Sequence, residues 1–312
     1  MRFRVIALLA VGGLLLPLLS PWSSSLPDVL RWPLDLVVHW QLLFTSVLAI
    51  SGVCWAFAAR SALVLALLPL CALPWLTGHS HRAGFSELTG TDEVVRVASA
   101  NLHFENDNLE AVLQWLEQER VDVAVLLEVS IAAGAKLAQQ KRFPHMLVAA
   151  RDDPFGMAIV SREPLSQTLV RNAKVGGTPV LEAVTFKGSR SFRVVGVHPM
   201  PPLSAEYVHD RDAALSMEAR AANESVLPTL IAGDLNATVW SSGFDALSSL
   251  GWRTVAPLPG TWHAGLPAML GIGIDHILVD HRWRALSSKT GPSLGSDHRA
   301  VLAEVVPLES SD

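Results

Sequence analysis

The chain has almost no cysteine: among its 312 residues, only Cys54 and Cys71 carry a thiol. Both lie in strongly apolar segments near the N-terminus, and the sequence from residue 79 onward has none. A soluble region without cysteine has neither disulfides nor thiolate metal ligands, which excludes disulfide-stapled domains and cysteine zinc sites. The absence permits a location outside the cytoplasm without indicating one.

Charge is also scarce at the N-terminus, where the first 78 residues carry only Arg2, Arg4, Asp28, Arg31, Asp35 and Arg60. This part contains three apolar stretches, at residues 3–20, about 36–59 and 61–76. A helix needs about 20 apolar residues to cross the hydrocarbon core of a membrane. No small-residue cleavage site follows the first stretch, which disfavours a removable signal peptide. We therefore expect a membrane anchor of about three transmembrane helices within residues 1–78.

The few positive charges of the anchor predict its orientation. Arg2 and Arg4 precede the first predicted span, and Arg60 lies in the short loop between the second and the third. The loop at 21–35 carries one arginine and two aspartates. Because cytoplasmic loops are enriched in Lys and Arg, the arginine flanks belong inside. We expect a multi-pass protein of a bacterial inner membrane, with its C-terminal region on the periplasmic or extracellular side.

Basic runs are missing from the remainder of the chain. From residue 92 onward, 19 Lys and Arg are set against 26 Asp and Glu. Extensive binding of a nucleic-acid backbone needs clustered Lys and Arg. This balance argues against tight or processive DNA binding, and it leaves a weak nonspecific nuclease possible.

The sequence after the anchor divides into a polar linker at 79–92 and a region at 93–312 in which strand and helix patterns follow one another. Predicted strands lie at 94–98, 121–127, 146–149, 156–161, 179–186, 192–198, 229–232, 274–279 and 300–306. Helical periodicity is present at 107–119, 130–140 and about 205–227. Strand–helix–strand units and runs of strands in one domain predict an α/β fold with two packed sheets and helices outside.

Polar side chains stand where the predicted strands meet loops: Asn101, Glu128, His198, Asp234, Asn236, Asp275, Asp297 and His298. Any one of them alone is more simply explained as a turn residue, a helix cap or a packed histidine. Together they favour a functional site, because sites are commonly built on loops held by a rigid scaffold. Their carboxylate and amide oxygens suit Mg²⁺ or Mn²⁺, and an Asp–His pair suits general-base work. That combination describes the hydrolysis of a phosphate ester.

Short motifs make a resemblance specific. ASANLH, LLEVS, GMAIVSREPL, VVGVHP, IAGDLNAT, IDHILV and GSDHRAV occur in the order found in the endonuclease/exonuclease/phosphatase, or DNase I-like, superfamily. The resemblance covers about residues 92–308, and GDLN and SDH are its most specific motifs. The chain looks most like a bacterial membrane-anchored branch of that superfamily. The resemblance implies a four-layer α/β sandwich.

The resemblance also implies roles by position. Glu128 would bind Mg²⁺ or Mn²⁺, with Asn101 and Asp297 close to the ion. His298 would activate the attacking water, oriented by Asp275 or Asp297. Asp234 would hold the nucleophile or a second metal. Asn236 and His198 would bind the scissile phosphate.

Three residues near the motifs have no clear role from the sequence. Arg162 of the SREP motif is as compatible with a structural contact as with a substrate contact. Trp240 and Trp262 lie in loops near the motifs, where they line a substrate pocket or pack in the core. Six other histidines are expected to be packing or surface residues: His103, His145, His209, His263, His276 and His281.

The expected function is a membrane-anchored, divalent-metal-dependent phosphoesterase that resembles a nuclease. A phospholipid or sphingolipid headgroup phosphodiesterase and an inositol-phosphate phosphatase remain alternatives, because the anchor holds the domain beside lipid. A membrane scaffold that has lost catalysis is the alternative from another class. The expected partners are a phosphate-ester substrate, nucleic acid or lipid headgroup, and the bilayer that holds the N-terminal helices. No protein partner can be inferred.

Overall fold

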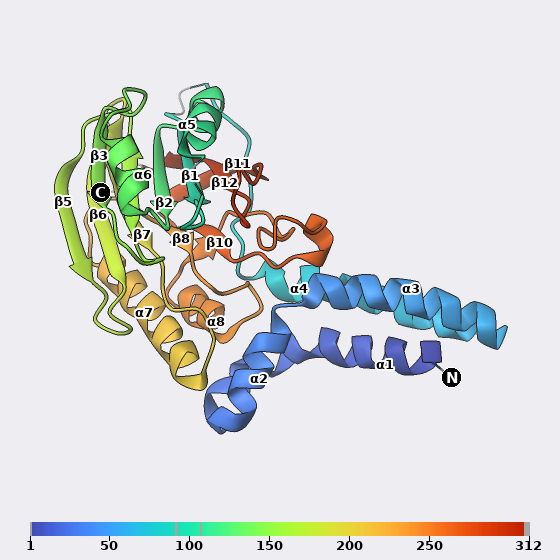
Figure 1. Ribbon diagram of the computed structural model, residues 1–312. Helices are drawn as coiled ribbons and strands as arrows, with labels where there is room; N and C mark the ends of the chain where they lie inside the picture. The colour runs from blue at the N-terminus through green and yellow to red at the C-terminus, as the bar shows by residue number, and fades with distance from the viewer. Residues whose placement is uncertain (1, 91–92, 107, 309–312) are drawn as a thin grey trace.

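The computed structural model describes residues 2–90, 93–106 and 108–308. Residues 91 and 92, at the end of the predicted linker, and residues 107 and 309–312 lie outside the described part. The chain forms a projecting bundle of apolar helices and a larger α/β body (Figure 1).

The bundle is built from three segments that are long and apolar enough to cross a membrane, Arg2–Leu19, Gln41–Ala59 and Ala62–His79. Their regular elements are α1 (Arg2–Leu15), η1 (Leu16–Ser25), α3 (Gln41–Ala59), η2 (Ala62–Ala72) and α4 (Leu73–His79). Ala7, Ala10, Leu14 and Leu48 form the buried centre of the bundle. The expected three candidate spans are therefore present.

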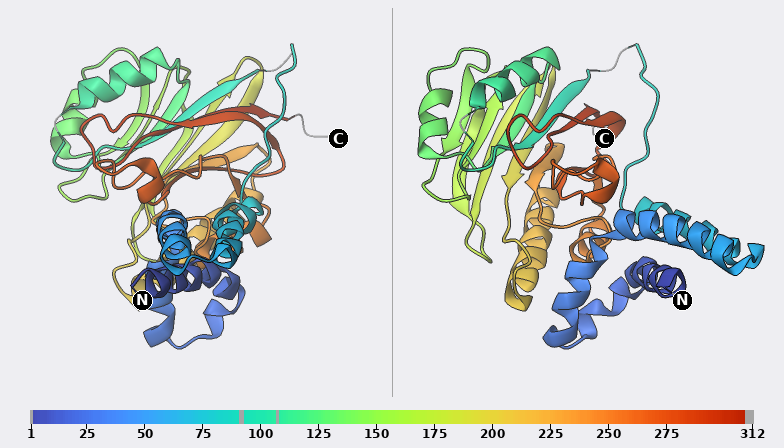
Figure 2. Two further views of the ribbon diagram at one scale, coloured as in Figure 1. Left: turned by 90° about the vertical axis from the view of Figure 1, so that its right-hand side faces the viewer. Right: turned by 45° about the vertical axis from the view of Figure 1, so that its right-hand side comes forward.

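The bundle helices run alternately away from and toward the α/β body (Figures 1 and 2). Helix α1 begins, and helix α3 ends, at the end of the bundle far from that body. Arg2 and Arg4 lie at the start of α1, and Arg60 is the C-cap of α3. The three arginines are thus together at the distal end.

A helix that the sequence analysis did not anticipate lies between the first two candidate spans. Helix α2 (Asp28–Val38) covers the second half of the segment expected to be a loop and the first residues of the span expected at about 36–59. Its buried residues are Arg31, Asp35 and Val38, which share one face at helical spacing. Two of the three are charged, so apolar periodicity gave no indication of this helix.

Two six-stranded mixed sheets form the α/β body. The first has the order β11 (Trp283–Thr290), β12 (Val301–Pro307), β1 (Val95–Asn101), β2 (Val123–Leu127), β4 (Met157–Ser161), β3 (His145–Ala149). The second has the order β5 (Ser166–Asn172), β6 (Pro179–Lys187), β7 (Arg190–Val197), β8 (Thr229–Asp234), β10 (Asp275–Val279), β9 (Arg253–Thr254).

Helices cover the outer face of each sheet. Helices α5 (Leu109–Gln118) and α6 (Ile131–Leu137) contribute buried side chains to the core outside the first sheet. Helices α7 (Ala205–Asn223) and α8 (Ser242–Ser249) do so outside the second, and η3 (Ala268–Leu270) lies in the loop before β10. Between the sheets, Val125, Ile159 and Ile277 are among the fully buried residues of the central core. The predicted four-layer α/β sandwich is confirmed.

Strands β5 and β11 were not predicted from the sequence. Both lie at sheet edges, and most residues of β5 are exposed. An exposed edge strand carries no continuous apolar side, so the alternation that marks other strands is weak there. Helix α7 also ends at Asn223, four residues before the predicted end at 227.

The polar segment after α4 follows the surface of the sandwich. The amide of Ala83 donates to the carbonyl of Thr254 at 2.9 Å, and the amide of Ser86 donates to the carbonyl of Ala285 at 2.9 Å. These backbone contacts to β9 and β11 tie the segment to both sheets.

Candidate active site

The predicted site residues lie at one edge of both sheets because of how the strands pair. Strands β1 and β2 are parallel, as are β7 and β8, so their C-terminal ends are side by side. Strand β10 is antiparallel to β8, and Asp275 at its start lies opposite Asp234 at the end of β8. Strand β12 is antiparallel to β1, so the SDH motif just before β12 falls at the same edge.

Asn101 joins carboxylates from the two sheets. Its Nδ2 donates to Glu128 Oε1 at 2.9 Å and to Asp234 Oδ2 at 3.3 Å. The second oxygen of Glu128, Oε2, accepts the backbone amide of Phe104 at 2.8 Å. Asn101 Oδ1 accepts the amide of His103 at 2.9 Å. This arrangement fixes two acidic groups against each other at the floor of the site.

Two site residues have left-handed backbone conformations: φ is 57° at Glu128 and 50° at Asn236. Asparagine tolerates this region, but for glutamate it costs about 1–2 kcal/mol. Such strain persists where the surroundings dictate it, and it concentrates at functional sites. At Glu128 it turns the chain directly after β2, so that the carboxylate meets Asn101.

His298 is held by a buried aspartate. Its Nδ1 donates to Asp275 Oδ2 at 2.9 Å, which leaves Nε2 3.8 Å from Asp234 Oδ2. Asp297, the other candidate for orienting this ring, has Oδ1 4.0 Å from Nε2 and Oδ2 hydrogen-bonded to Trp262 Nε1 at 2.9 Å. Asp275 is therefore the carboxylate on the Nδ1 side of the imidazole.

Burial and mutual charge shift the pKa values of this group. Burial lowers the pKa of His298, but the charges of Asp275, Asp234 and Asp297 outweigh it and raise that pKa to about 10. Burial, followed by the charge of Asp275, raises the pKa of Asp234 to about 7. Strongly shifted values in a cleft are typical of functional sites.

His198 completes the polar floor as a neutral imidazole. It is buried, and that burial lowers its pKa to about 4. Its Nε2 lies 3.6 Å from Asp234 Oδ2, and its ring centre lies 5.3 Å from that of Phe155. At neutral pH His198 can donate or accept a hydrogen bond without carrying charge.

The loop after β8 is fixed at both of its polar residues. The Asn236 amide donates to Asp234 Oδ1 at 2.9 Å, and Asn236 Nδ2 donates to the Pro199 carbonyl at 3.0 Å. Gly233, before Asp234, is required because a Cβ there would lie 1.8 Å from the carbonyl oxygen of Val197. Only glycine lets β8 approach β7 this closely.

Comparison with known proteins identifies the family of the chain. Residues 98–298 match the model of the Endonuclease/Exonuclease/phosphatase family. The chain belongs to that family. Members of the family are hydrolases that act on phosphoester bonds, and they generally use divalent metals. No curated protein matches the sequence.

Several solved structures share the family fold. D. rerio TDP2 humanized by 14 mutations has a TM-score of 0.58 at 14% identity, covering 68% of this chain and 99% of its own. A family protein from Bacteroides vulgatus has a TM-score of 0.58 at 18% identity, covering 69% and 99%. The human Nocturnin catalytic domain with bound sulfate has a TM-score of 0.54 at 15% identity, covering 72% and 97%. At these identities the likeness shows the fold.

The donor groups fit the divalent cation that the family implies. Ligand atoms of Asp234, Asp275 and His298, all buried, lie within 4.8 Å of one another. Asp275 Oδ1 is buried and has no hydrogen-bond partner among the described residues. Buried carboxylates facing each other are costly unless a positive charge compensates them. Oxygen donors of this kind suit Mg²⁺ or Mn²⁺.

That buried trio differs from the predicted metal set of Asn101, Glu128 and Asp297. Glu128 is joined to Asp234 through Asn101, so both sets border the same floor. Within the trio, His298 and Asp275 are already hydrogen-bonded to each other. This contact favours a general base with its orienting carboxylate over two separate metal ligands. The individual metal roles stay predictions.

Some residues near the motifs lie away from the site. Arg162 donates from Nε to the Val121 carbonyl at 2.7 Å, and its guanidinium lies over the Phe143 ring, 5.2 Å from the centre. Trp240 is buried and donates to the Pro74 carbonyl at 3.0 Å. His276 is buried, with Nε2 3.0 Å from the Ala237 carbonyl oxygen. All three have packing or structural contacts.

A cleft of about 670 Å³ opens over the polar floor. It contains six of the eight predicted site residues: Glu128, His198, Asp234, Asn236, Asp297 and His298. Sequence reasoning missed much of its wall, including Phe155, Tyr207, Leu36, His39 and Trp40. Trp262, left undecided from the sequence, also lines the cleft. Leu36, His39 and Trp40 belong to the N-terminal segment, which contains none of the recognised motifs.

Proposed function

We propose that the protein is a membrane-anchored, divalent-cation-dependent phosphoesterase in which His298 activates the attacking water. The observation that carries the proposal is the Asp275–His298 pair, hydrogen-bonded at 2.9 Å, with Nε2 directed toward the acidic floor of the cleft. A histidine held in this way by a buried carboxylate is a typical general base.

The residues divide the work of ester hydrolysis. Water oxygen forms the new P–O bond, and its proton passes to His298 Nε2. The ester P–O bond breaks, the leaving oxygen takes a proton from solvent water, and His298 then returns its proton to solvent. Asp275 stabilises the imidazolium that forms, because its carboxylate already accepts the Nδ1 hydrogen. His198 and Asn236 stand beside Asp234, where they would bind the phosphate oxygens.

Glu128 and Asp297, with Asn101 beside them, would hold Mg²⁺ or Mn²⁺. When bound, the ion would supply charge stabilisation to the phosphate as its oxygens become more negative. Asp297, one of the carboxylates that raise the pKa of His298, would share the charge of such a cation. Its part of the raising effect would then weaken, which would lower the pKa of His298 toward the range of a general base.

Cation dependence tests the proposal. The full chain in detergent is assayed with bis-p-nitrophenyl phosphate in Mg²⁺, Mn²⁺ or EDTA. We expect turnover that EDTA removes and that Glu128→Gln lowers by about 10²-fold or more. Glu119→Gln is the control, since Glu119 pairs with Lys289 far from the cleft.

A catalytically inactive scaffold is the contrary outcome of that assay. It would show as no cation-dependent turnover, with Glu128→Gln and wild type indistinguishable. The predicted acidic and imidazole groups are all in place, and they converge on one floor, which supports the enzyme instead.

The arrangement of the bundle supports a catalytic region on the non-cytoplasmic side of a bacterial inner membrane. Arg2, Arg4 and Arg60 lie at the end of the bundle far from that region, and cytoplasmic flanks are enriched in such residues. A C-terminal reporter fusion that is active only in the periplasm tests the orientation. An inactive reporter on a fusion that is present in the membrane at the wild-type amount would overturn it.

A further inference from the structure

The N-terminal segment that leads into the membrane also forms part of the catalytic cleft. Leu36 of α2, and His39 and Trp40 just after it, line the same cleft as the residues of the polar floor. The next residue, Gln41, begins α3, a candidate membrane span. The wall of the cleft is therefore continuous with a helix expected to enter the bilayer.

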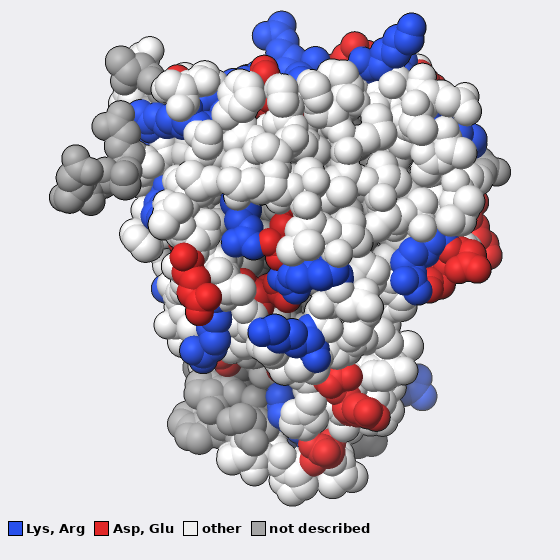
Figure 3. Space-filling model, turned by 90° about the vertical axis from the view of Figure 1, so that its left-hand side faces the viewer, with Lys and Arg blue, Asp and Glu red and all other residues white. Residues whose placement is uncertain are grey.

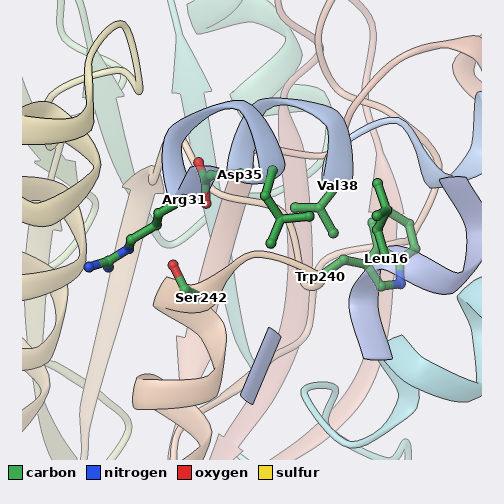
Figure 4. Close-up of a pocket in the computed structure, with 7 residues that line it drawn as sticks. Leu16, Arg31, Asp35, Val38, Trp240 and Ser242 are labelled. Carbon is green, nitrogen blue, oxygen red and sulfur yellow. The ribbon is translucent and has the colours of Figure 1, made fainter. Parts of the chain in front are cut away.

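Buried polar contacts hold this wall in place. Asp35 accepts two hydrogen bonds from Arg211 of α7, at 2.9 and 3.0 Å, and Arg31 Nη2 lies 3.2 Å from Asp212 Oδ2. His39 Nδ1 and Thr238 Oγ1, in the loop after Asn236, are 2.9 Å apart. Figure 4 shows α2 side chains lying over Trp240 and Ser242 of the α/β body, with Arg31 extended toward α7.

Apolar packing accompanies these contacts. Val38 and Leu42 belong to the same buried cluster as Leu215 and Phe244 of the outer helices. A small cavity between α2 and the body, lined by residues that include Arg31, Val38 and Trp240, has a volume of about 10 Å³. The wall is thus part of the folded catalytic region and not a loosely attached tether.

The composition of the cleft argues against a polynucleotide. None of the described residues that line it is Lys or Arg, whereas binding of a nucleic-acid backbone depends on such residues. On the face drawn in Figure 3, basic and acidic side chains are likewise interspersed, without a broad basic surface.

Apolar side chains instead surround the polar floor. Met200, Leu203 and Tyr207 from the β7–α7 region face the same cleft as Leu36 and Trp40. Leu203 is 68% exposed, although it is a large aliphatic side chain. Exposed apolar residues beside a candidate span, with a tryptophan at its start, are typical of a surface that meets the membrane interface.

We infer that the cleft accepts the phosphate ester of a membrane lipid, with the phosphate on the polar floor and the apolar part along Leu36, Trp40 and Leu203. This inference rests on the proposed phosphoesterase function and adds the class of its substrate. The N-terminal helices would then both hold the protein beside the bilayer and select the substrate.

The test uses the full chain with two soluble diesters that share one leaving group, methyl p-nitrophenyl phosphate and hexyl p-nitrophenyl phosphate. We expect kcat/KM for the hexyl ester to exceed that for the methyl ester by about 10- to 100-fold, because buried methylenes favour binding. Trp40→Ala and Leu203→Ala should each reduce this ratio, mainly through KM of the hexyl ester. Leu203→Ala is informative even if Trp40→Ala misfolds, since Leu203 is exposed.

Trp75→Ala is the matched control, because Trp75 is 42% exposed on α4 and does not line the cleft. It should retain the wild-type ratio. Equal cation-dependent rates for the two esters would overturn the inference and leave the phosphoesterase intact. No cation-dependent rate for either ester would instead contradict the proposed function itself. Faster cleavage of a single-stranded oligonucleotide than of the hexyl ester would also overturn the lipid assignment.

A second arm separates a lipid from a free phosphate ester of the same chemistry. The chain is held in dodecyl maltoside micelles, which contain no phosphate, and phosphatidic acid is added to the micelles while hydrolysis of the hexyl ester is followed. Phosphatidic acid should compete, whereas glycerol phosphate at the same total concentration should not. Equal competition by the two would show a phosphate site without lipid selection and would overturn the inference.

Discussion

Arg211 and Asp35 form a buried ion pair that joins the α/β body to the segment before the second candidate span. Arg211 is fully buried, and its Nη1 and Nη2 donate to the two carboxylate oxygens of Asp35 at 3.0 and 2.9 Å. Nη1 also donates to the backbone carbonyl of Asn236 at 2.9 Å. One guanidinium thus links α2 to the loop that carries two predicted site residues.

Loss of this pair should destabilise the protein. Asp35→Asn leaves a buried guanidinium with less compensating charge, which costs about 3 kcal/mol. Asp28→Asn, in the same helix but with the exposed partner His209, should cost less than about 1 kcal/mol. Thermal unfolding of the detergent-solubilised chain, followed by tryptophan fluorescence, measures the difference. Equal melting temperatures for the two variants would contradict a structural role for Asp35.

Asp35 should also make the stability of the fold depend on pH in the acidic range. Burial raises the pKa of Asp35, but Arg211 and His39 outweigh it and hold that pKa well below its usual range. A carboxyl with a depressed folded pKa stabilises above its unfolded value of about 4, and this contribution is lost as the pH falls below that value. Melting temperatures from pH 6 down to about pH 3 should therefore decline more steeply in wild type than in Asp35→Asn. Parallel curves would exclude this linkage.

Gly233 should be irreplaceable for a steric reason. A Cβ at this position would lie 1.8 Å from the Val197 carbonyl oxygen, a backbone atom of β7 that cannot move without breaking the sheet. Gly233→Ala is expected to lower stability by about 3 kcal/mol or more, and to displace Asp234. Gly84→Ala is the control, because a Cβ there meets no atom within 4 Å. Wild-type melting and activity in Gly233→Ala would refute the close approach of β7 and β8.

The pH profile of hydrolysis should depend on Asp275. This carboxylate is the largest of the influences that raise the pKa of His298, so Asp275→Asn lowers that pKa. A base with a lower pKa is deprotonated at lower pH, and the acidic limb of the kcat/KM profile should shift downward. The maximum should fall by about 10²- to 10⁴-fold, because the imidazole loses its orienting partner.

Asp245→Asn serves as the comparison for that profile, since Asp245 lies near His81 and outside the cleft. It should keep the wild-type limb. An acidic limb that stays in place or moves upward in Asp275→Asn would remove Asp275 from the role assigned to it.

Local sequence was sufficient to predict which residues meet at the polar floor of the cleft. Asp234, Asp275 and His298 each stand beside a short apolar run, and strand pairing brings such positions to one edge. The residue types at positions 233 and 236 also fit their backbone. Glycine permits the close contact at Gly233, and asparagine tolerates the positive φ at Asn236. Motifs of this kind depend on neighbours within a few residues, which a sequence displays directly.

The part of the cleft wall that α2 and the residues just after it form was not predictable by the same reasoning. The contact between Arg31 and Asp212 joins residues 181 positions apart, and that between Asp35 and Arg211 spans 176. A charged residue between two apolar stretches reads as part of a polar loop, and only the distant partner explains its burial. The edge strand β5 was missed for a related reason, because its exposed residues lack an apolar side.

The most direct test of the account is the rate of the full-length His298→Ala variant with bis-p-nitrophenyl phosphate at saturating Mn²⁺. The account predicts a kcat about 10²- to 10⁴-fold below wild type, with the melting temperature retained. His281→Ala, which removes an exposed histidine outside the catalytic cleft, should remain within about twofold of wild type. A folded His298→Ala variant that turns over at the wild-type rate would contradict the central claim that this histidine activates water.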